Sequence, residues 1–272
     1  MRGFLRTYTP FAKAGTQQMM AYKANFIFHL IGEIFSCFIM FFIWKAVFLN
    51  SNGETFMGFT MNDMVVYIFI SFMTGYLSYS DGAFALGEEI VDGSVSMRLI
   101  KPCSFDMCFL FQELGSRIIS YGIIFVPIVA GVEIYRYFLT GSVQFSIVNF
   151  LLFFLSLQFA YLINFYFNVI YGFLAFYLKN LWGTNLIKEV IVNFLSGATI
   201  PLAFMPSVIQ TVLTYLPFSS LSYTPVMIYM GMYSSSQIIF SLALQIFWIF
   251  AFWGISKLVW RSAIKRICVQ GG

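Results

Sequence analysis

The side chains able to carry chemistry are concentrated in one stretch, residues 87–117, which reads GEEIVDGSVSMRLIKPCSFDMCFLFQELGSR. It contains five acidic and three basic residues, which are Glu88, Glu89, Asp92, Arg98, Lys101, Asp106, Glu113 and Arg117. One charge costs about 2.5–3.5 kcal/mol at the centre of a membrane-spanning helix. Because nearly everything on either side is apolar, we expect this stretch to stand in water between two membrane segments.

A second polar pair lies near the start of the chain. His29, the one histidine, precedes Glu33 by four residues, so the two share one face of a helix. Two interpretations stay open: a polar spot on a subunit interface or substrate path, or a hydrogen-bonded pair near the cytoplasmic end. This intramembrane pair is also the only feature that favours an ion-coupled secondary carrier.

Motifs for self-contained catalysis do not occur. The sequence has no G-x-x-x-x-G-K-[ST] phosphate-binding loop, no H-E-x-x-H and no G-x-S-x-G. The four cysteines show neither a disulfide framework nor zinc spacing, and they are Cys37, Cys103, Cys108 and Cys268. We therefore expect no metal site, no bound cofactor and no enzyme activity in this chain, and an energy source that lies elsewhere.

Composition indicates an all-α polytopic membrane protein. The 272 residues are 60% hydrophobic and 10% charged, whereas soluble domains carry roughly 25% charged residues. The apolar runs are long and continuous instead of alternating, which disfavours a β-barrel. We expect one transmembrane domain over residues 1–272 with six membrane helices, at about residues 24–48, 63–80, 117–138, 145–178, 189–200 and 237–260.

Three further segments complete the expected architecture. Residues 1–23 contain Thr9-Pro10, a helix-start signal, and apolar residues at helical spacing, which is typical of an amphipathic helix on the membrane surface. Residues 81–116 form the polar loop between the second and third helices, with a short helix expected at 105–114. Residues 190–256 carry no charge but hold four prolines, which predicts a re-entrant outer hairpin at 206–225 within an extracellular segment 201–236.

Orientation follows from the basic residues. With six spans and both termini in the cytoplasm, every Lys and Arg except Lys45 and Arg136 falls on the cytoplasmic side or at its interface. The net charge of +4 thus reflects membrane topology, and no basic-aromatic stripe suggests a nucleic-acid partner.

Three stretches together resemble a known family. They are residues 88–117, the segment YGFLAFYLKNLWG at 171–183, and LSGATIPLAFMPSVIQTVLTYLPFSSLSYTPVMIYMG at 195–231. In order and spacing they are similar to the permease subunit of type 2 ATP-binding cassette exporters, in the compact six-helix branch. The Lys101-Pro102-Cys103 element departs from the family pattern, in which further small or polar residues follow the proline.

The resemblance implies a mechanism and partners. Two permease subunits, identical or related, would pair in the lipid membrane above two ABC ATPase subunits, which bind ATP and Mg²⁺. A short cytoplasmic helix would dock on the ATPase and pass its motion to the membrane helices. The coupling residues carried over are Glu88, Glu89, Asp92, Gly93, Arg98, Lys101, Pro102, Phe105 and Phe109. The outer hairpin would form a gate, with its prolines Pro201, Pro206, Pro217 and Pro225.

The implied function is export of an amphiphilic substrate, such as a drug, an antimicrobial peptide or a lipid-like compound, across a bacterial cell membrane. Phe, Tyr and Met dominate the apolar segments, which fits amphiphiles better than ions or sugars. Alternatives are a carbohydrate-polymer exporter of the same architecture, or a membrane scaffold or immunity subunit that does not transport.

Overall fold

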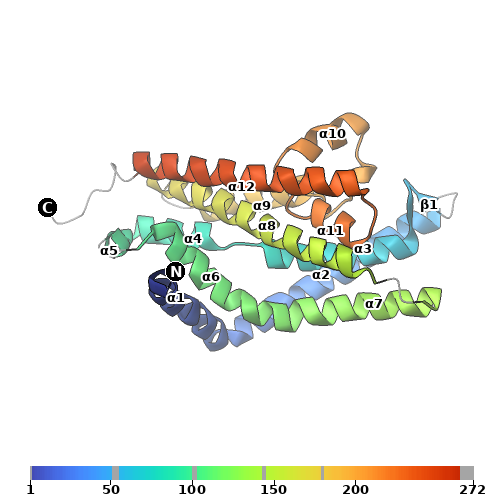
Figure 1. The fold of residues 1–272 in the computed structure, drawn as a ribbon, viewed down its shortest axis with the longest axis horizontal. Coiled ribbons are helices and arrows are strands. Elements are labelled where there is room, and N and C mark those ends of the chain that lie inside the picture. The colour runs from blue at the N-terminus through green and yellow to red at the C-terminus, as the bar shows by residue number, and fades with distance from the viewer. Residues whose placement is uncertain (1, 51–54, 100–102, 143–144, 179–180, 264–272) are drawn as a thin grey trace.

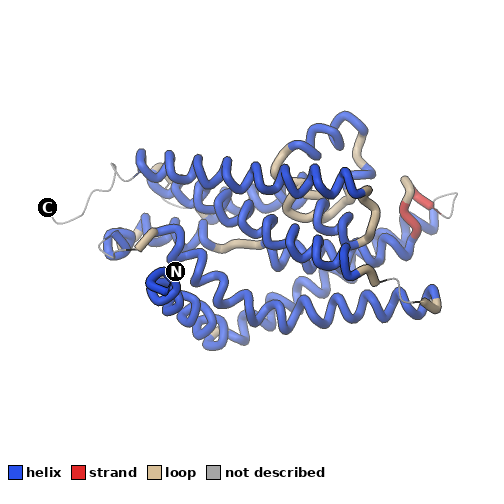
Figure 2. Tube along the Cα trace, viewed as in Figure 1, coloured by secondary structure: helices blue, strands red, loops and turns tan. Residues whose placement is uncertain are grey.

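The computed structural model describes residues 2–50, 55–99, 103–142, 145–178 and 181–263. Apart from one two-stranded hairpin, the elements in these ranges are helices (Figures 1 and 2). In the first half they are α1 (Arg2–Ala21), α2 (Lys23–Asn50), β1 (Thr55–Phe56), β2 (Phe59–Thr60), α3 (Met61–Ser78), α4 (Gly82–Val91), α5 (Val95–Leu99) and α6 (Phe105–Ser120). In the second half they are η1 (Tyr121–Phe125), α7 (Val126–Thr140), α8 (Ile147–Gly172), η2 (Phe173–Phe176), α9 (Trp182–Leu195), η3 (Leu202–Phe204), α10 (Ser207–Tyr215), α11 (Tyr223–Tyr229) and α12 (Ser235–Ala263).

Four helical segments in the described ranges are long and apolar enough to cross a membrane, namely residues 23–49, 106–140, 147–176 and 235–263. The helical content and these four candidate spans are consistent with the expected all-α polytopic membrane class. The expected second and fifth spans correspond to α3, with 18 residues, and α9, with 14 residues. Neither helix is among the segments that are both long and apolar enough to cross a membrane. Six spans therefore stay a prediction.

The third span differs from its expected form. We expected a separate short helix at 105–114 followed by a span at 117–138, and this division is wrong. Helices α6, η1 and α7 run on as one segment from Asp106 to Thr140. Pro127 lies just after the π-helical turn η1. A wide turn accommodates a proline inside a helix, because proline lacks an N–H and crowds the carbonyl four residues earlier.

The core gathers around α3, whose side chains pack against α8 and α11. Met64, Ile70 and Met73 of α3 are fully buried, as are Phe153 of α8 and Val226 of α11. By contrast, α2 lies along the edge of the bundle with most of its side chains exposed, as expected of a helix that faces lipid. The core thus holds a central α3 that is shorter than its neighbours.

The outer segments also differ from expectation. Between the first and second expected spans, residues 55–60 form a β-hairpin, with Thr55 opposite Thr60. Met57 and Gly58 at its turn have φ angles of 52° and 84°, the left-handed values of a tight hairpin turn. The helix expected at 189–200 is α9, which begins earlier, at Trp182, and ends earlier, at Leu195. The hairpin expected at 206–225 contains α10, and its last residues begin the buried helix α11.

The bundle has two distinct ends (Figure 1). Helices α1, α4 and α5 lie at the end where α6 begins and α12 finishes. The β-hairpin and the end of α7 lie at the opposite end. The charged stretch and the N-terminal helix are thus brought to one end of the molecule, although about 65 residues separate them in the sequence.

Candidate functional site

The charged stretch forms an exposed turn between α4 and α5. Gly93 has a φ of 79°, a conformation that side-chain-bearing residues rarely adopt. Asp92 Oδ1 accepts a 2.8 Å hydrogen bond from the Ser94 N–H. Hydrogen bonds from the Ser94 hydroxyl and N–H hold the pKa of Asp92 below its usual value. The turn is therefore a defined structure whose carboxylate stays ionised at neutral pH.

The surface of this turn is both charged and apolar. Glu88 and Asp92 are exposed, and so are Val91 and Met97, at 55% and 62% of their full areas. Exposed apolar side chains that stand beside charges on a protruding turn are typical of a contact surface for another protein.

Several expected coupling residues fall where side chains are not described. Lys101 and Pro102 lie outside the described residues, and the positions of Arg98 and Phe105 are known only as backbone in α5 and α6. Glu89 is half-buried on α4. Their expected roles therefore stay predictions.

The apolar face at the start of α6 is covered by the chain itself. Cys108 and Phe109 are 3% and 4% exposed, and Phe109 packs in a cluster with Leu86 of α4 and with Tyr161 and Phe165 of α8. Helices α4 and α8 cover this face, so it is not an open apolar surface. Phe109 is thus a packing residue between the exposed turn and the bundle.

A polar cluster surrounds Glu113 next to the start of α4, the helix that leads into the turn. Glu113 Oε1 accepts a 2.9 Å hydrogen bond from the Ser80 hydroxyl, and its Oε2 accepts a 3.0 Å bond from the Tyr161 hydroxyl. Gly82, at the start of α4, approaches so closely that a Cβ there would lie 2.9 Å from Glu113 Oε1. One carboxylate thereby connects α6 to α8 and to the junction of α3 with α4.

Arg117 supplies the cation of this cluster, one helical turn after Glu113. Its guanidinium carbon lies 3.5 Å from the centre of the Tyr161 ring, and its Nη1 donates a 3.3 Å hydrogen bond to the Tyr79 carbonyl. Arg117 is 7% exposed, and its Nε and Nη2 find no partner among the described residues. Since a buried cation needs compensation, the Tyr161 ring face and the Tyr79 carbonyl are the contacts that stabilise it.

The sequence reasoning missed this cluster. Glu113 and Arg117 belong to the stretch that was expected to stand in water, but the protein buries them against α8. Their spacing of four residues, glutamate before arginine, was the available signal, because it places the two on one helix face.

Helix α1 crosses α6 at two glycines. A Cβ on Gly15 would lie 1.8 Å from the Gln112 carbonyl oxygen, and one on Gly115 would lie 1.8 Å from that of Ala12. The close approach lets the Thr16 hydroxyl donate a 2.9 Å hydrogen bond to the Gly115 carbonyl. The amphipathic N-terminal helix thus packs on the helix that follows the exposed turn.

Side chains reinforce this crossing along its length. The Tyr8 hydroxyl accepts a 2.9 Å hydrogen bond from the N–H of Ser104, the residue before α6, and the Tyr8 ring stacks on Phe111 at 5.2 Å. Gln112 donates a 3.0 Å hydrogen bond to Gln18 at the other end of the contact. Helix α1 therefore clamps α6 from its first residue to its third turn.

An ion pair joins the start of α6 to the end of α12. Lys257 Nζ lies 2.9 Å from both carboxylate oxygens of Asp106, which is buried in the first turn of α6. An anion there is also favoured by the helix dipole. The last spanning helix is thereby tied to the same end of α6 that α1 clamps.

The junction between α3 and α4 carries a group of acidic side chains. Burial first, and then the carboxylates of Glu189 and Glu88, raise the pKa of Asp81. Glu189 Oε1 also accepts a 3.2 Å hydrogen bond from the Tyr79 hydroxyl. Three carboxylates, those of Asp81, Glu88 and Glu189, therefore lie near one another between the end of α3 and the start of α4.

The other expected site residues lie away from this end. His29 sits edge-on to the Tyr76 ring at 5.9 Å, and no hydrogen bond or ion pair between His29 and Glu33 is found among the described residues. The hydrogen-bonded interpretation of that pair therefore has no support. Of the outer prolines, Pro206 is exposed before α10, whereas the other three are buried: Pro201, Pro217 and Pro225.

Metal and catalytic chemistry find no support in this geometry. The described part of the chain contains no group of three His, Cys, Asp or Glu side chains that could hold a metal ion. The contacts described above connect α4, which leads into the exposed turn, with α6 and α8, and connect α6 with α12.

Comparison with known families decides the class of protein. The sequence model described as ABC-2 family transporter protein matches residues 34–271. The chain belongs to the ABC-2 transporter family. As an ABC-2 protein with long apolar helices it is a multi-pass membrane protein, and the match is consistent with a permease subunit of type 2 ABC transporters. A search of curated proteins found no match.

Proposed function

We propose that this ABC-2 protein is the permease subunit of an ATP-driven exporter, and that a separate ATPase subunit hydrolyses ATP. The observation that carries the proposal is that α4, which leads into the exposed α4–α5 turn, begins at Gly82 in close contact with Glu113 of α6. A transporter subunit without a phosphate-binding loop needs a surface that receives force, and this turn has the exposure and the internal connections for it.

Helix α4 packs tightly against its neighbours, so a displacement of α4 would be transmitted to the rest of the bundle. A Cβ at Gly82 would meet Glu113, and one at Gly87 would lie 2.6 Å from the Leu181 side chain before α9. Closely packed elements shift as rigid units because interiors are dense. Movement of α4 would therefore displace α6, and through the Asp106–Lys257 pair the end of α12 as well.

The contact residues we assign on this basis modify the expected set. Val91 and Met97 join it as the exposed apolar members of the turn. Phe109 acts behind the surface, since it is buried. The remaining members keep their proposed role at the ATPase contact, and they are Glu88, Glu89, Asp92, Gly93, Arg98, Lys101, Pro102 and Phe105.

The proposed assembly contains two ATPase copies, which hold the ATP and Mg²⁺, and a second permease that is identical or related. We place six spans in a bacterial cell membrane with both termini in the cytoplasm. In this arrangement the segment with Pro201, Pro206, Pro217 and Pro225 lies at the outer side as a gate. The abundance of aromatic and Met side chains supports an amphiphilic substrate.

The test uses the full chain co-expressed with its ATPase. Val91→Asp with Met97→Asp places charge on the apolar part of the turn and is expected to reduce co-purification of the ATPase and its stimulation by the permease. Met57→Asp is the matched control, because Met57 is equally exposed, at 63%, on the hairpin at the other end. Full co-purification of the double variant would refute the assignment of this turn, and a chain that transports without any ATPase would refute the proposed function.

A further inference from the structure

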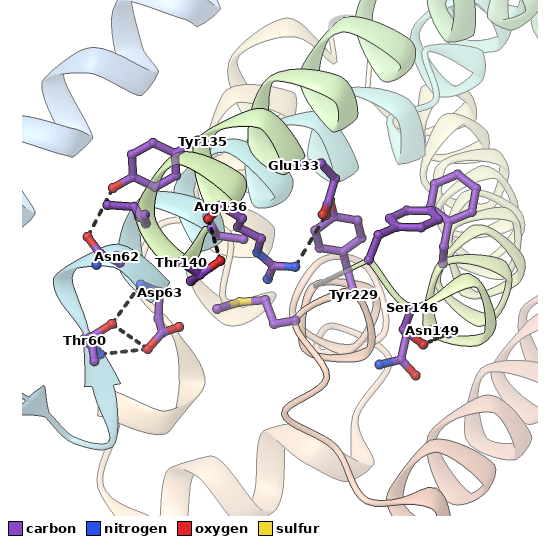
Figure 3. Close-up of a pocket in the computed structure, with 15 residues that line it drawn as sticks. Thr60, Asn62, Asp63, Glu133, Tyr135, Arg136, Thr140, Ser146, Asn149 and Tyr229 are labelled. Carbon is purple, nitrogen blue, oxygen red and sulfur yellow. Dashed lines mark hydrogen bonds and ion pairs between the residues drawn. The ribbon is translucent and has the colours of Figure 1, made fainter. Parts of the chain in front are cut away.

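A polar cavity opens at the end of the bundle opposite the α4–α5 turn (Figure 3). It has a volume of about 390 Å³, within the range of small-molecule sites, roughly 300–1,000 Å³. Its walls come from the start of α3, the end of α7, the start of α8 and the end of α11. None of its lining residues belongs to the coupling region described above.

Arg136 provides the cation of this cavity. Among the described residues its guanidinium makes one hydrogen bond, a long one of 3.4 Å from Nη1 to Glu133 Oε1. That same oxygen accepts a short 2.5 Å bond from the Tyr229 hydroxyl. Glu133 is therefore shared, and most of the five N–H donors of Arg136 are left for another acceptor. Such a planar fork suits a phosphate or a carboxylate.

Asp63 provides an anion on a different wall. Its Oδ2 accepts hydrogen bonds from the Thr60 N–H at 3.0 Å and the Thr60 hydroxyl at 2.7 Å, which cap α3. In Figure 3 its other carboxylate oxygen is turned away from Thr60. No basic side chain among the described residues is paired with Asp63. Its second oxygen can accept from an ammonium group.

The remaining walls combine neutral polar and apolar groups. Amide and hydroxyl groups line the space between the charges, from Asn62, Thr140, Ser146 and Asn149. Apolar side chains complete it, from Val66, Leu139, Phe145, Phe150 and Met230. A polar site bordered by apolar surface suits a molecule with a polar head and an apolar tail.

The balance of charge narrows the ligand further. Asp63 and Glu133 are the acidic lining residues and Arg136 is the basic one, so their formal charges sum to one negative charge. A purely anionic head would face two carboxylates, and a purely cationic head would face Arg136. A head with both charges satisfies both walls and adds no net charge.

We propose that this cavity binds the head group of a zwitterionic amphiphile, with the phosphate or carboxylate on Arg136 and the ammonium on Asp63. Binding at this site requires neither the ATPase nor transport, so it stands or fails separately from the proposed function. The same head-group chemistry could be supplied by a membrane lipid or by a soluble zwitterion.

The test is native mass spectrometry of the purified full chain in a neutral maltoside detergent. Three probes share the same acyl chains: phosphatidylethanolamine with both charges, phosphatidylglycerol with the phosphate alone, and a diacyl trimethylammonium lipid with the cation alone. We expect the first to bind about tenfold or more tightly than either of the others, because each probe with one charge loses a charge-assisted contact.

Variants assign the effect to the cavity. Arg136→Gln is expected to weaken phosphatidylethanolamine binding by about tenfold or more, and Asp63→Asn, which keeps an oxygen for the α3 cap, to do the same. Lys45→Gln is the matched control, because Lys45 is exposed on α2 and does not line the cavity. Equal binding of the three lipids, or unchanged binding by Arg136→Gln, would overturn the proposal.

A fourth probe separates the two sources of the head group. Glycerophosphoethanolamine carries both charges without acyl chains. Binding of this soluble probe that Arg136→Gln abolishes supports the site and indicates a soluble zwitterion as a sufficient ligand. Binding of the lipid alone, with the same sensitivity to Arg136→Gln, supports the site and indicates a lipid.

Discussion

The crossing of α1 and α6 provides a sharp test of the fold at the end of the bundle that carries the α4–α5 turn. In Gly115→Ala the new Cβ would lie 1.8 Å from the Ala12 carbonyl oxygen, whereas contacts of 3.0–3.4 Å are already tight. That oxygen belongs to the backbone of a helix and cannot rotate away. Helix α1 must therefore move outward by more than an ångström, or leave α6 altogether.

The expected cost follows from three contributions. Overpacking of this kind costs about 1–3 kcal/mol. Loss of the Thr16 hydrogen bond to the Gly115 carbonyl lowers the unfolding free energy by about 1 kcal/mol more. The higher helix propensity of alanine offsets this by about 1 kcal/mol. The net loss of stability is thus about 1–3 kcal/mol, and Gly15→Ala, which meets Gln112 in the same way, is expected to match it.

Two measurements check this expectation. Denaturant titration in detergent gives the change in unfolding free energy. Disulfide formation in Gln18→Cys/Gln112→Cys, with the four native cysteines replaced by alanine, reports whether α1 stays in place. Gly131→Ala is the matched control in the same long helix, because a Cβ there meets no atom within 4 Å, and it should be neutral or slightly stabilising. If Gly115→Ala behaved like this control in both measurements, the described crossing would be wrong.

Two further predictions concern the end of the bundle that carries the α4–α5 turn. Glu113→Ala is expected to lower the unfolding free energy by about 1–3 kcal/mol, because the hydroxyl groups of Ser80 and Tyr161 would lose their acceptor inside the protein. Glu113→Gln, which keeps hydrogen-bonding capacity, should lose clearly less, and exposed Glu88→Gln should change little; equal losses in the two Glu113 variants would contradict the cluster. Asp81→Asn is expected to raise thermal stability at neutral pH, because the fold raises the pKa of this carboxyl from 3.8 and so disfavours its ionised form. Ionised Asp81 destabilises the fold only above pH 3.8, and this destabilisation grows as the pH rises. The increase in unfolding temperature caused by Asp81→Asn should therefore be larger at pH 8 than at pH 4. An increase that does not change with pH would contradict the prediction.

Much of the membrane class could be predicted from composition and from runs of apolar residues. The first, fourth and sixth expected spans agree with α2, α8 and α12 to within a few residues. Such long helices are determined locally, because a run of apolar residues has only one way to cross a bilayer with its backbone satisfied. The family assignment reached from motif order is likewise confirmed by the match over residues 34–271.

Boundaries near prolines and glycines were less predictable. Pro127 was expected inside a span, and it is, but the helix continues back to Asp106 because a π-helical turn absorbs the strain. The hairpin at 55–60 was missed because Met57 and Gly58 are weak turn signals without a long strand on either side. In such segments the ends of helices and strands depend on contacts with neighbouring elements, which the local sequence does not show.

The sequence by itself determined the membrane class, the concentration of charge in residues 87–117, and the absence of a G-x-x-x-x-G-K-[ST] motif from the 272 residues. Each of these follows from residue type and local order alone. Only the tertiary structure decided which charges of that stretch are exposed and which are buried. Asp92 stays on the surface, whereas Glu113 and Arg117 turn inward because Tyr161 and Ser80, from distant segments, supply the partners that water would otherwise provide.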